Sequence, residues 1–258
     1  MSITLDFSGK VALITGASQG IGAEMARRFH AAGASVILNH PDLGNTRADA
    51  EQLAATLNVA RPNSADVAAA DVSAATAVQR MMQGVKARRG GIDFLINNAG
   101  ILRDRTLAKM SVEDWQTVVD VNLTGVFLCC KFGLEIMRDG GAIVGLGSIS
   151  AFHGSFGQAN YVAAKAGVQG LMRVVSREAA RRRHPRQCHC ARRGGHRDGG
   201  NHPGNGAGGN GEKHSARAAR HAIRSGECGA LPLLAVGVLR YGANHRSEWR
   251  LAGMKGAR

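Results

Sequence analysis

Short apolar runs alternate with longer amphipathic stretches over residues 1–182. Continuous apolar runs of four to seven residues are typical of strands in a parallel sheet that is covered on both faces. Such runs are Lys10–Thr15, Ser35–Asn39, a run that closes at Asp71-Val72, Ile92–Ile96 and Ala142–Ser148. Between them, apolar residues recur at helical spacing, for example Ile21, Met25, Phe29 and Ala32, and again from Trp115 to Phe127. The pattern predicts an α/β fold, a doubly wound parallel sheet of the Rossmann type, as a single domain over residues 1–182.

The pattern stops near Arg182. Residues 192–211 are glycine, histidine, asparagine and arginine with almost nothing to bury, and we expect them to be disordered. Leu231–Val236 is the only apolar patch that follows. We therefore expect the last strands of the sheet to be missing, or replaced by an irregular basic tail over residues 183–258.

The net charge of +14 is concentrated in this tail. Residues 183–258 hold 14 of the 33 Lys and Arg but only 4 of the 19 Asp and Glu. One reading is a nucleic-acid-binding arm, but Tyr241 and Trp249 are its only stacking aromatics. A second reading is a metal site, but the spacing matches no usual zinc pattern, so we assign none. Its candidate ligands are Cys188, His189, Cys190, His196 and His202.

A third reading, which we prefer, is a shift of the reading frame. When each codon is read one base later, Arg183 to Arg192 can encode Gly-Ile-Arg-Val-Asn-Ala-Ile-Ala-Pro-Gly, an apolar strand followed by a Pro-Gly turn. Tyr241 to Arg250, shifted in the same way, can encode Thr-Gly-Gln-Ile-Ile-Gly-Val-Asn-Gly-Gly. Two matches in one frame explain the excess of Arg, Gly, His and Cys without a selected function. We expect a chain with the literal tail to fold poorly and to have little activity.

A glycine-rich turn follows the first strand and leads directly into a helix. Such a turn lets backbone N–H groups and the helix N-terminus meet a pyrophosphate, because glycine permits close approach. The turn is Gly16-Ala17-Ser18-Gln19-Gly20-Ile21-Gly22. Its place after the first strand indicates a dinucleotide-binding site.

Tyr161 and Lys165 are four residues apart, which places the phenol and the ammonium on one face of a helix. A neighbouring ammonium stabilises the phenolate, so the tyrosine can donate or accept a proton near neutrality. Ser148 stands at the carboxyl end of the fifth predicted strand, where ligands bind in open parallel sheets. The three side chains predict reduction of a carbonyl or oxidation of an alcohol.

These motifs together resemble the short-chain dehydrogenase/reductase family, and in pattern bacterial 3-oxoacyl-acyl-carrier-protein reductases and acetoacetyl-CoA reductases. The resemblance covers about residues 8–182. It rests on Thr15-Gly16-x-x-x-Gly20-Ile21-Gly22, Asp71-Val72, Asn97-Asn98-Ala99-Gly100, Asn122, Ser148 and Tyr161-x-x-x-Lys165.

The resemblance implies a role for each matching residue. Tyr161 is implied to be the acid/base, Ser148 to orient the substrate oxygen, and Lys165 to bind the nicotinamide ribose and favour the phenolate. Asn122 is implied to hold a water in a proton relay beyond Lys165. The implied cofactor contacts are Gly16, Ser18, Gln19, Gly20, Ile21 and Gly22 at the phosphates, Asp71 and Val72 at the adenine and Asn98 at a ribose, with Asn39 and Gly100 as further contacts.

The end of the second strand bears on the choice of cofactor. Asn39-His40-Pro41 offers no carboxylate for the ribose 2′-OH before Asp42, which favours NADP over NAD. Arg47 is a candidate for the 2′-phosphate. Gln19, however, stands where NADP-dependent members commonly have arginine, so NAD stays an alternative.

The resemblance implies a small carbonyl or alcohol substrate, with a 3-oxoacyl thioester preferred and a sugar, steroid or aromatic diol as the alternative. A non-catalytic nucleotide-binding protein with a basic nucleic-acid-binding tail is the alternative from another class. We expect no membrane span and a cytoplasmic location, because five cysteines without an export signal indicate a reducing compartment. The resemblance also implies a homotetramer or dimer if the C-terminal part is intact. Cys129 and Cys130 are expected to pack in a helix core.

Overall fold

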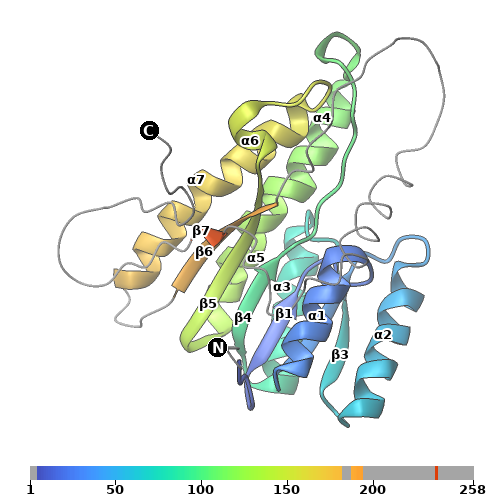
Figure 1. Cartoon of the computed structure of the whole chain (residues 1–258), viewed down its shortest axis with the longest axis vertical. Helices are drawn as coiled ribbons and strands as arrows, with labels where there is room; N and C mark the ends of the chain where they lie inside the picture. Colours follow the sequence, from blue (N-terminus) through green and yellow to red (C-terminus); the bar gives the residue numbers. More distant parts are fainter. Residues whose placement is uncertain (1–4, 182–186, 194–235, 238–258) are drawn as a thin grey trace, which may run out of the picture.

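The computed structural model describes residues 5–181, 187–193 and 236–237, and within them the chain forms one twisted sheet (Figure 1). The strands lie in the order β3-β2-β1-β4-β5-β6-β7. All neighbours are parallel except β6 and β7, which are antiparallel. The predicted doubly wound parallel sheet is confirmed. Its strands are β1 (Val11–Ile14), β2 (Ser35–His40), β3 (Ala65–Ala69), β4 (Ile92–Asn97), β5 (Met137–Ser148), β6 (Gln187–Arg193) and β7 (Val236–Gly237).

Helices cover both faces of this sheet, because alternate residues of each buried strand point to opposite sides. Ala12 and Ile14 of β1 pack in the core cluster that includes residues of α1 and α2. Val11 and Leu13 pack in the other cluster, with residues of α3, α5 and α7. The helices are α1 (Gly20–Ala31), α2 (Thr46–Ala60), α3 (Ala75–Arg89), α4 (Val112–Val119), α5 (Gly125–Ile136), α6 (Ser150–His153) and α7 (Ala159–Arg181). A short 3₁₀ turn, η1 (Leu107–Lys109), precedes α4, and a π-helical segment, η2 (Asp120–Thr124), joins α4 to α5.

The predicted third strand ends earlier than expected. β3 stops at Ala69, and Asp71 lies in the turn that follows. The Asp71 carboxylate accepts hydrogen bonds from the backbone N–H of Ser73 (2.9 Å) and from its hydroxyl (2.7 Å). This local pairing competes with continued strand pairing and turns the chain towards α3.

The continuous helical run Val112–Ile136 bears on the expectation that the chain has no membrane span. In the part of the chain that the structure describes, this run of 25 residues is long and apolar enough to cross a membrane by length and composition alone. Val118, Val126 and Ile136 pack in the core beneath the sheet. Part of its apolar surface is therefore used in packing, whereas Val112, Trp115 and Phe127 are exposed.

A strand follows Arg182, where the sequence pattern indicated none. β6 pairs in parallel with β5, with Ala142 opposite Gln187 and Ser148 opposite Arg193. The edge of β5 presents backbone N–H and C=O groups that any extended segment can pair with, so strand formation here does not need an apolar sequence. The expectation of disorder is wrong for Arg192 and Arg193, which lie in β6. Residues 194–211 lie outside the described part of the chain.

Candidate active site

The glycine turn lies between β1 and α1 and has the backbone that only glycine adopts without strain. Gly16 and Gly20 have φ values of +61° and +58°. A Cβ on Gly20 would meet no atom within 4 Å, so the backbone there faces open space. The first turn of α1 carries no acidic side chain. An anion such as a pyrophosphate therefore fits at this helix N-terminus, next to the predicted contacts Ser18, Gln19 and Ile21.

Thr15, which follows β1, and Asn98, which follows β4, stabilise the glycine turn by hydrogen bonds. The Asn98 side-chain Nδ2 donates to the carbonyl oxygens of Thr15 and Gly16, both at 2.9 Å. The Thr15 hydroxyl accepts from the backbone N–H groups of Asn98 and Ala99, both at 3.0 Å. Both N–H groups of the Asn98 amide are thus used inside the protein. Its structural role is bracing the turn, and a contact with ribose stays a prediction.

Asn39 lies beneath the turn and has no exposed surface. Its Oδ1 accepts from Gly16 N (3.3 Å), and its Nδ2 donates to the carbonyls of Ala68 (3.1 Å) and Ala70 (3.0 Å). It therefore supports the cofactor turn indirectly. Arg47, the candidate for a 2′-phosphate, lies on the exposed side of α2 and pairs with Glu51 at 2.9 Å.

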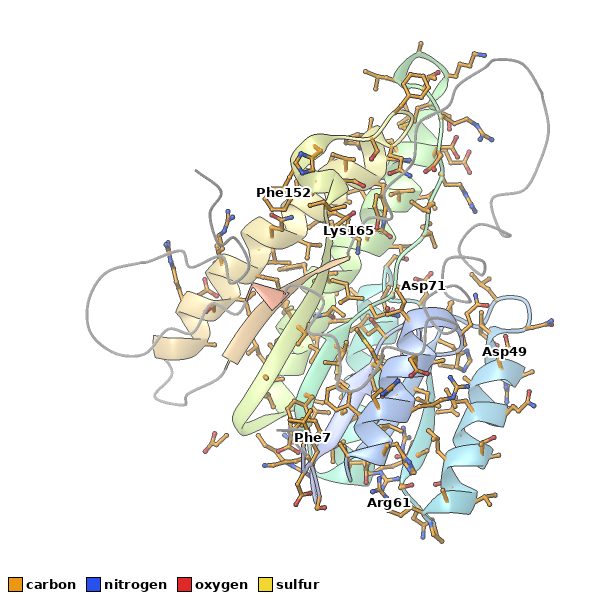
Figure 2. The ribbon with its side chains drawn as sticks, in the orientation of Figure 1. Phe7, Asp49, Arg61, Asp71, Phe152 and Lys165 are labelled. Carbon is orange, nitrogen blue, oxygen red and sulfur yellow. The ribbon has the colours of Figure 1, made fainter. Side chains whose placement is uncertain are left out.

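The catalytic candidates gather at the carboxyl end of the sheet. Ser148 ends β5, and Tyr161 and Lys165 lie on the first turns of α7; they are 5%, 7% and 4% exposed. The Lys165 Nζ donates to the carbonyl oxygen of Leu146 (2.7 Å) and lies 5.8 Å from the centroid of the Tyr161 ring. In Figure 2, Lys165 and Asp71 lie towards this end of the sheet, and Phe7 and Arg61 towards the other. The structure thus brings the phenol and the ammonium together, as the spacing predicted.

Asn122 is fully buried in the π-helical segment η2. Its Oδ1 accepts from the backbone N–H of Ile101 (2.8 Å), and its Nδ2 donates to the carbonyl oxygen of the same residue (2.9 Å). A Cβ on Gly100 would lie 3.2 Å from Asn122 Oδ1 and 3.8 Å from Lys165 Nζ. Gly100 thus lies between these two side chains, and an alanine there would require Asn122 Oδ1 to move by a few tenths of an ångström.

Two buried side chains of this region were not predicted from the sequence. Thr15 and Asn160 are 2% and 0% exposed, and both make several hydrogen bonds. The signal for Asn160 was present, because an asparagine directly before the tyrosine stands at a helix start, where its amide can bond backbone groups. The signal for Thr15 was its place between a buried strand and the first glycine.

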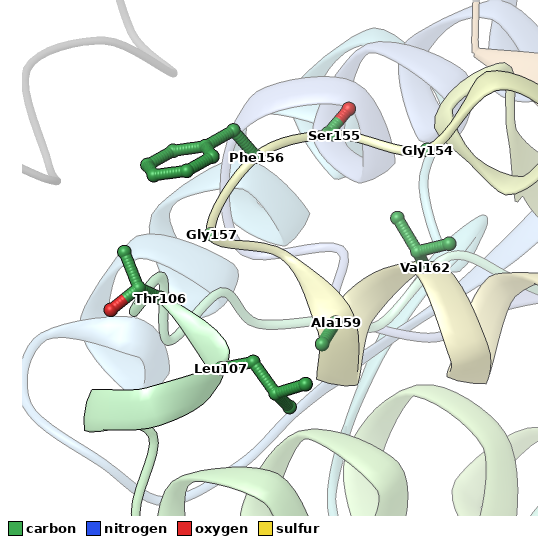
Figure 3. Close-up of a pocket in the computed structure, with 8 residues that line it drawn as sticks. All are labelled: Thr106, Leu107, Gly154, Ser155, Phe156, Gly157, Ala159 and Val162. Atoms are coloured by element: carbon green, nitrogen blue, oxygen red, sulfur yellow. The ribbon is translucent and has the colours of Figure 1, made fainter.

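A hollow of about 360 Å³ lies beside the first turn of α7 (Figure 3). Ala159 and Val162 of α7 form one wall and Leu107 of η1 another, and the loop that contains Phe156 lies across from them. The lining is mainly apolar; its other residues are Thr106, Gly154, Ser155 and Gly157.

Among residues 5–181, the two cysteines lie in the core and not at this site. Cys129 and Cys130 are buried in α5, as predicted, and burial raises the pKa of the Cys129 thiol. His153 is exposed on α6. Within residues 5–181, 187–193 and 236–237, no three His, Cys, Asp or Glu side chains gather as metal ligands. The side chains of the tail candidates Cys188, His189, Cys190, His196 and His202 lie outside the described part.

Comparison with known proteins gives consistent matches over the same region. The family model described as short chain dehydrogenase matches residues 10–184. A 3-oxoacyl-[acyl-carrier-protein] reductase of Synechocystis is 42% identical over 177 residues, which are 68% of this chain and 70% of the relative. The Escherichia coli reductase FabG of the same description is 36% identical over 185 residues, 69% and 70% of the two chains.

Two further matches extend the comparison. The peroxisomal multifunctional enzyme type 2 of Drosophila melanogaster is 41% identical over 182 residues, 69% of this chain and 30% of that protein. The crystal structure of a Brucella melitensis short-chain dehydrogenase/reductase, titled glucose/ribitol dehydrogenase, superposes with a TM-score of 0.68 and 33% identity. The superposition covers 74% of this chain and 77% of that one.

Proposed function

The chain belongs to the short-chain dehydrogenase/reductase family and is an NAD(P)-dependent oxidoreductase, and we propose that it reduces 3-oxoacyl thioesters with NADPH. The observation that carries the proposal is the buried group of Ser148, Tyr161 and Lys165 at the carboxyl end of β5. The substrate class is supported by the relatives from Synechocystis and Escherichia coli, which are 3-oxoacyl-[acyl-carrier-protein] reductases.

Each side chain of the site has a part in the proposed reduction. A nicotinamide bound beside the glycine turn would supply the hydride for the carbonyl carbon. Tyr161 gives its phenolic proton to the carbonyl oxygen, and the Ser148 hydroxyl donates a hydrogen bond that orients this oxygen. The Lys165 ammonium stabilises the resulting Tyr161 phenolate by its charge. Its Nζ lies 5.8 Å from the centroid of the Tyr161 ring.

The return of the proton to Tyr161 involves η2. The Asn122 side chain is fixed by two hydrogen bonds to Ile101, which use one of its N–H groups and one lone pair of its oxygen. The backbone of η2 offers a partner for a relay water, because Gly125 N bonds to Asp120 O five residues back and the regular i→i−4 pattern is interrupted. We therefore assign the water site to the η2 backbone, with Asn122 fixing its position.

NADP is the proposed cofactor, with NAD as the alternative. β2 ends without a carboxylate, and Asn39 directs its amide inward to Gly16 and to the carbonyls after β3. The end of β2 thus carries no carboxylate that would repel a 2′-phosphate. The ratio of NADPH to NADH dissociation constants, measured by fluorescence titration, tests the preference, and tighter binding of NADH would reverse the assignment.

The proposal includes the C-terminal part. The family model stops matching at residue 184, which is the point where the shifted frame begins to encode an apolar strand and a Pro-Gly turn. We propose that residues 183–258 are the product of a frame shift and that the restored frame supplies the last strands and the contacts of a homotetramer or dimer. Sequencing the gene across codons 178–195 tests this directly: an unshifted frame in the genomic DNA would refute it. Cys129 and Cys130 form no disulfide within the described residues, which accords with the proposed cytoplasmic location.

Turnover tests the function. Three proteins are compared: the printed chain, a frame-restored chain, and Tyr161→Phe in the restored chain. Each is assayed for oxidation of NADPH with acetoacetyl-CoA. Each is also assayed in the reverse direction, for reduction of NADP with a sugar and with an aromatic diol. We expect thioester reduction by the restored chain, much less by the printed one, and a loss of about 10²–10⁴-fold in Tyr161→Phe. Normal activity of Tyr161→Phe would refute the proposed acid/base.

A further inference from the structure

Asn160 directly precedes the catalytic tyrosine and has no exposed surface, although it is polar and lies at the start of a helix. Its amide is almost fully used. The Nδ2 donates to the carbonyl oxygens of Arg103 (3.0 Å) and Asp114 (3.1 Å), and the Oδ1 accepts from the backbone N–H of Tyr161 (2.8 Å). Such a buried polar group is costly to misplace, so these three bonds fix its position closely.

The two carbonyls belong to different segments. Arg103 lies in the connection that follows β4, and Asp114 lies in the first turn of α4, which Ser111 caps by accepting from Asp114 N (2.9 Å). Asn160 therefore ties the first turn of α7 to both segments at once. A neighbouring bond, from Gln158 Nε2 to Asp104 Oδ2 (2.9 Å), joins the same loop to the same region but is exposed.

The other end of the connection after β4 is held by the site itself. Asn122 binds both backbone groups of Ile101, and Gly100 lies against Asn122 and Lys165. The short segment from Ile101 to Arg103 is thus fixed between two buried amides, one on η2 and one on α7. This segment continues from Asn98, which braces the glycine turn.

We propose that Asn160 is a positioning residue that sets Tyr161 relative to the cofactor turn. It reaches no reacting atom, and it acts by anchoring the backbone of Tyr161 to a segment that is continuous with the turn. Loss of its two N–H donors releases the first turn of α7 from Arg103 and Asp114. The Tyr161 phenol then shifts relative to the cofactor turn. The inference rests on the proposed function, since it takes Tyr161 as the acid/base.

The full-length chain offers a direct reporter, because it contains only two tyrosines, Tyr161 and Tyr241. NMR of chain labelled with ¹³C at the tyrosine ring gives two signals, and the Tyr161 signal is identified by its absence in Tyr161→Phe. NADPH is titrated into the wild type, Asn160→Asp and the matched control Gln158→Ala. Asn160→Asp keeps the size and the acceptor oxygen but removes both donors.

We expect NADPH to shift the Tyr161 signal in the wild type and in Gln158→Ala, and the shift to fall by at least about half in Asn160→Asp, while the dissociation constant for NADPH changes less than about threefold. Equal shifts in the three proteins would overturn the inference. A loss of NADPH binding in parallel with the loss of shift would also overturn it, because that result describes general loosening of the fold. If the printed chain does not melt cooperatively, the titration is made with the frame-restored chain, in which Tyr161 is identified in the same way. Failure of a folded wild type to bind NADPH would refute the proposed function instead.

Thermal melting of each variant shows whether it is folded at the temperature of the titration. If Asn160→Asp does not fold, Asn160→Ala removes both donors without adding a charge and is titrated in its place. Turnover adds a second readout in the frame-restored chain: Asn160→Asp lowers kcat about 10–100-fold, and adds no further loss in the Tyr161→Phe background. A full additional loss in that background would contradict action through Tyr161.

Discussion

Replacement of Gly22 by alanine tests how the glycine turn holds the cofactor. A Cβ at this position would lie 2.3 Å from Gly16 O, 2.5 Å from Asn98 Nδ2 and 3.0 Å from Ala17 Cα. None of these atoms moves freely, because two are backbone and Asn98 Nδ2 is held by two carbonyls at 2.9 Å. The turn must therefore open and at least one of these hydrogen bonds must break. Overpacking and the lost bonds together cost about 2–4 kcal/mol.

Most of this cost appears at the phosphate site, since the turn backbone is the predicted ligand. If about 2 kcal/mol of it is expressed in binding, the NADPH dissociation constant of Gly22→Ala rises about 30-fold. Fluorescence titration measures the constant, and Gly170→Ala on α7 is the control, because a Cβ there meets nothing within 4 Å. A dissociation constant for Gly22→Ala within a factor of about three of the wild type would refute this account of the turn.

Three further predictions concern stability. The same Gly170→Ala change raises the free energy of unfolding by up to about 1 kcal/mol in a denaturant titration, because alanine favours the helix more than glycine does; a decrease would contradict the open space around it. Asp93→Asn lowers the free energy of unfolding by about 2 kcal/mol, because the buried carboxylate accepts from Val11 N and Arg138 Nη1, both at 2.9 Å, and from Lys10 Nζ at 3.1 Å; an unchanged urea midpoint would contradict it. Burial lowers the pKa of His30, which bonds Ser64 at 2.6 Å, and the Arg61 charge adds to the effect. Its neutral form is favoured in the fold, so its contribution is complete above its ordinary pKa of 6.5 and is lost as the pH falls towards the lowered value. Melting temperatures from pH 5 to 8 should therefore fall less on the acid side in His30→Gln, and parallel curves would contradict this.

The sequence predicted the sheet because its strands are buried on both faces and read as continuous apolar runs. The grouping of Ser148, Tyr161 and Lys165 was predictable for a different reason, since the strand ends of a parallel sheet meet at one edge and the tyrosine and lysine are one helical turn apart. Neither inference needed knowledge of side-chain contacts. The boundary of β3 was less accurate, because the Asp71–Ser73 pairing is a local competition that periodicity does not show.

Contacts between distant segments were beyond the sequence. Asn39 was predicted at the cofactor surface, but its partners on β1 and after β3 direct it inward. Asn160 was overlooked because its acceptors lie 46 and 57 residues away in the chain. β6 was missed because composition argued against a strand, whereas pairing with the edge of β5 depends on the backbone. Packing and pairing partners decide such positions, and one sequence without its contacts does not show them.

Transfer of deuterium from the cofactor to the product tests the central claim most directly. The frame-restored chain and the printed chain are each given NADPH deuterated at both C4 positions together with acetoacetyl-CoA, and the product is analysed by mass spectrometry. The account predicts a 3-hydroxyacyl thioester with one deuterium at C3 from the restored chain, lost in Tyr161→Phe. An unlabelled product, or no product from either chain under conditions where NADPH binds, would contradict it.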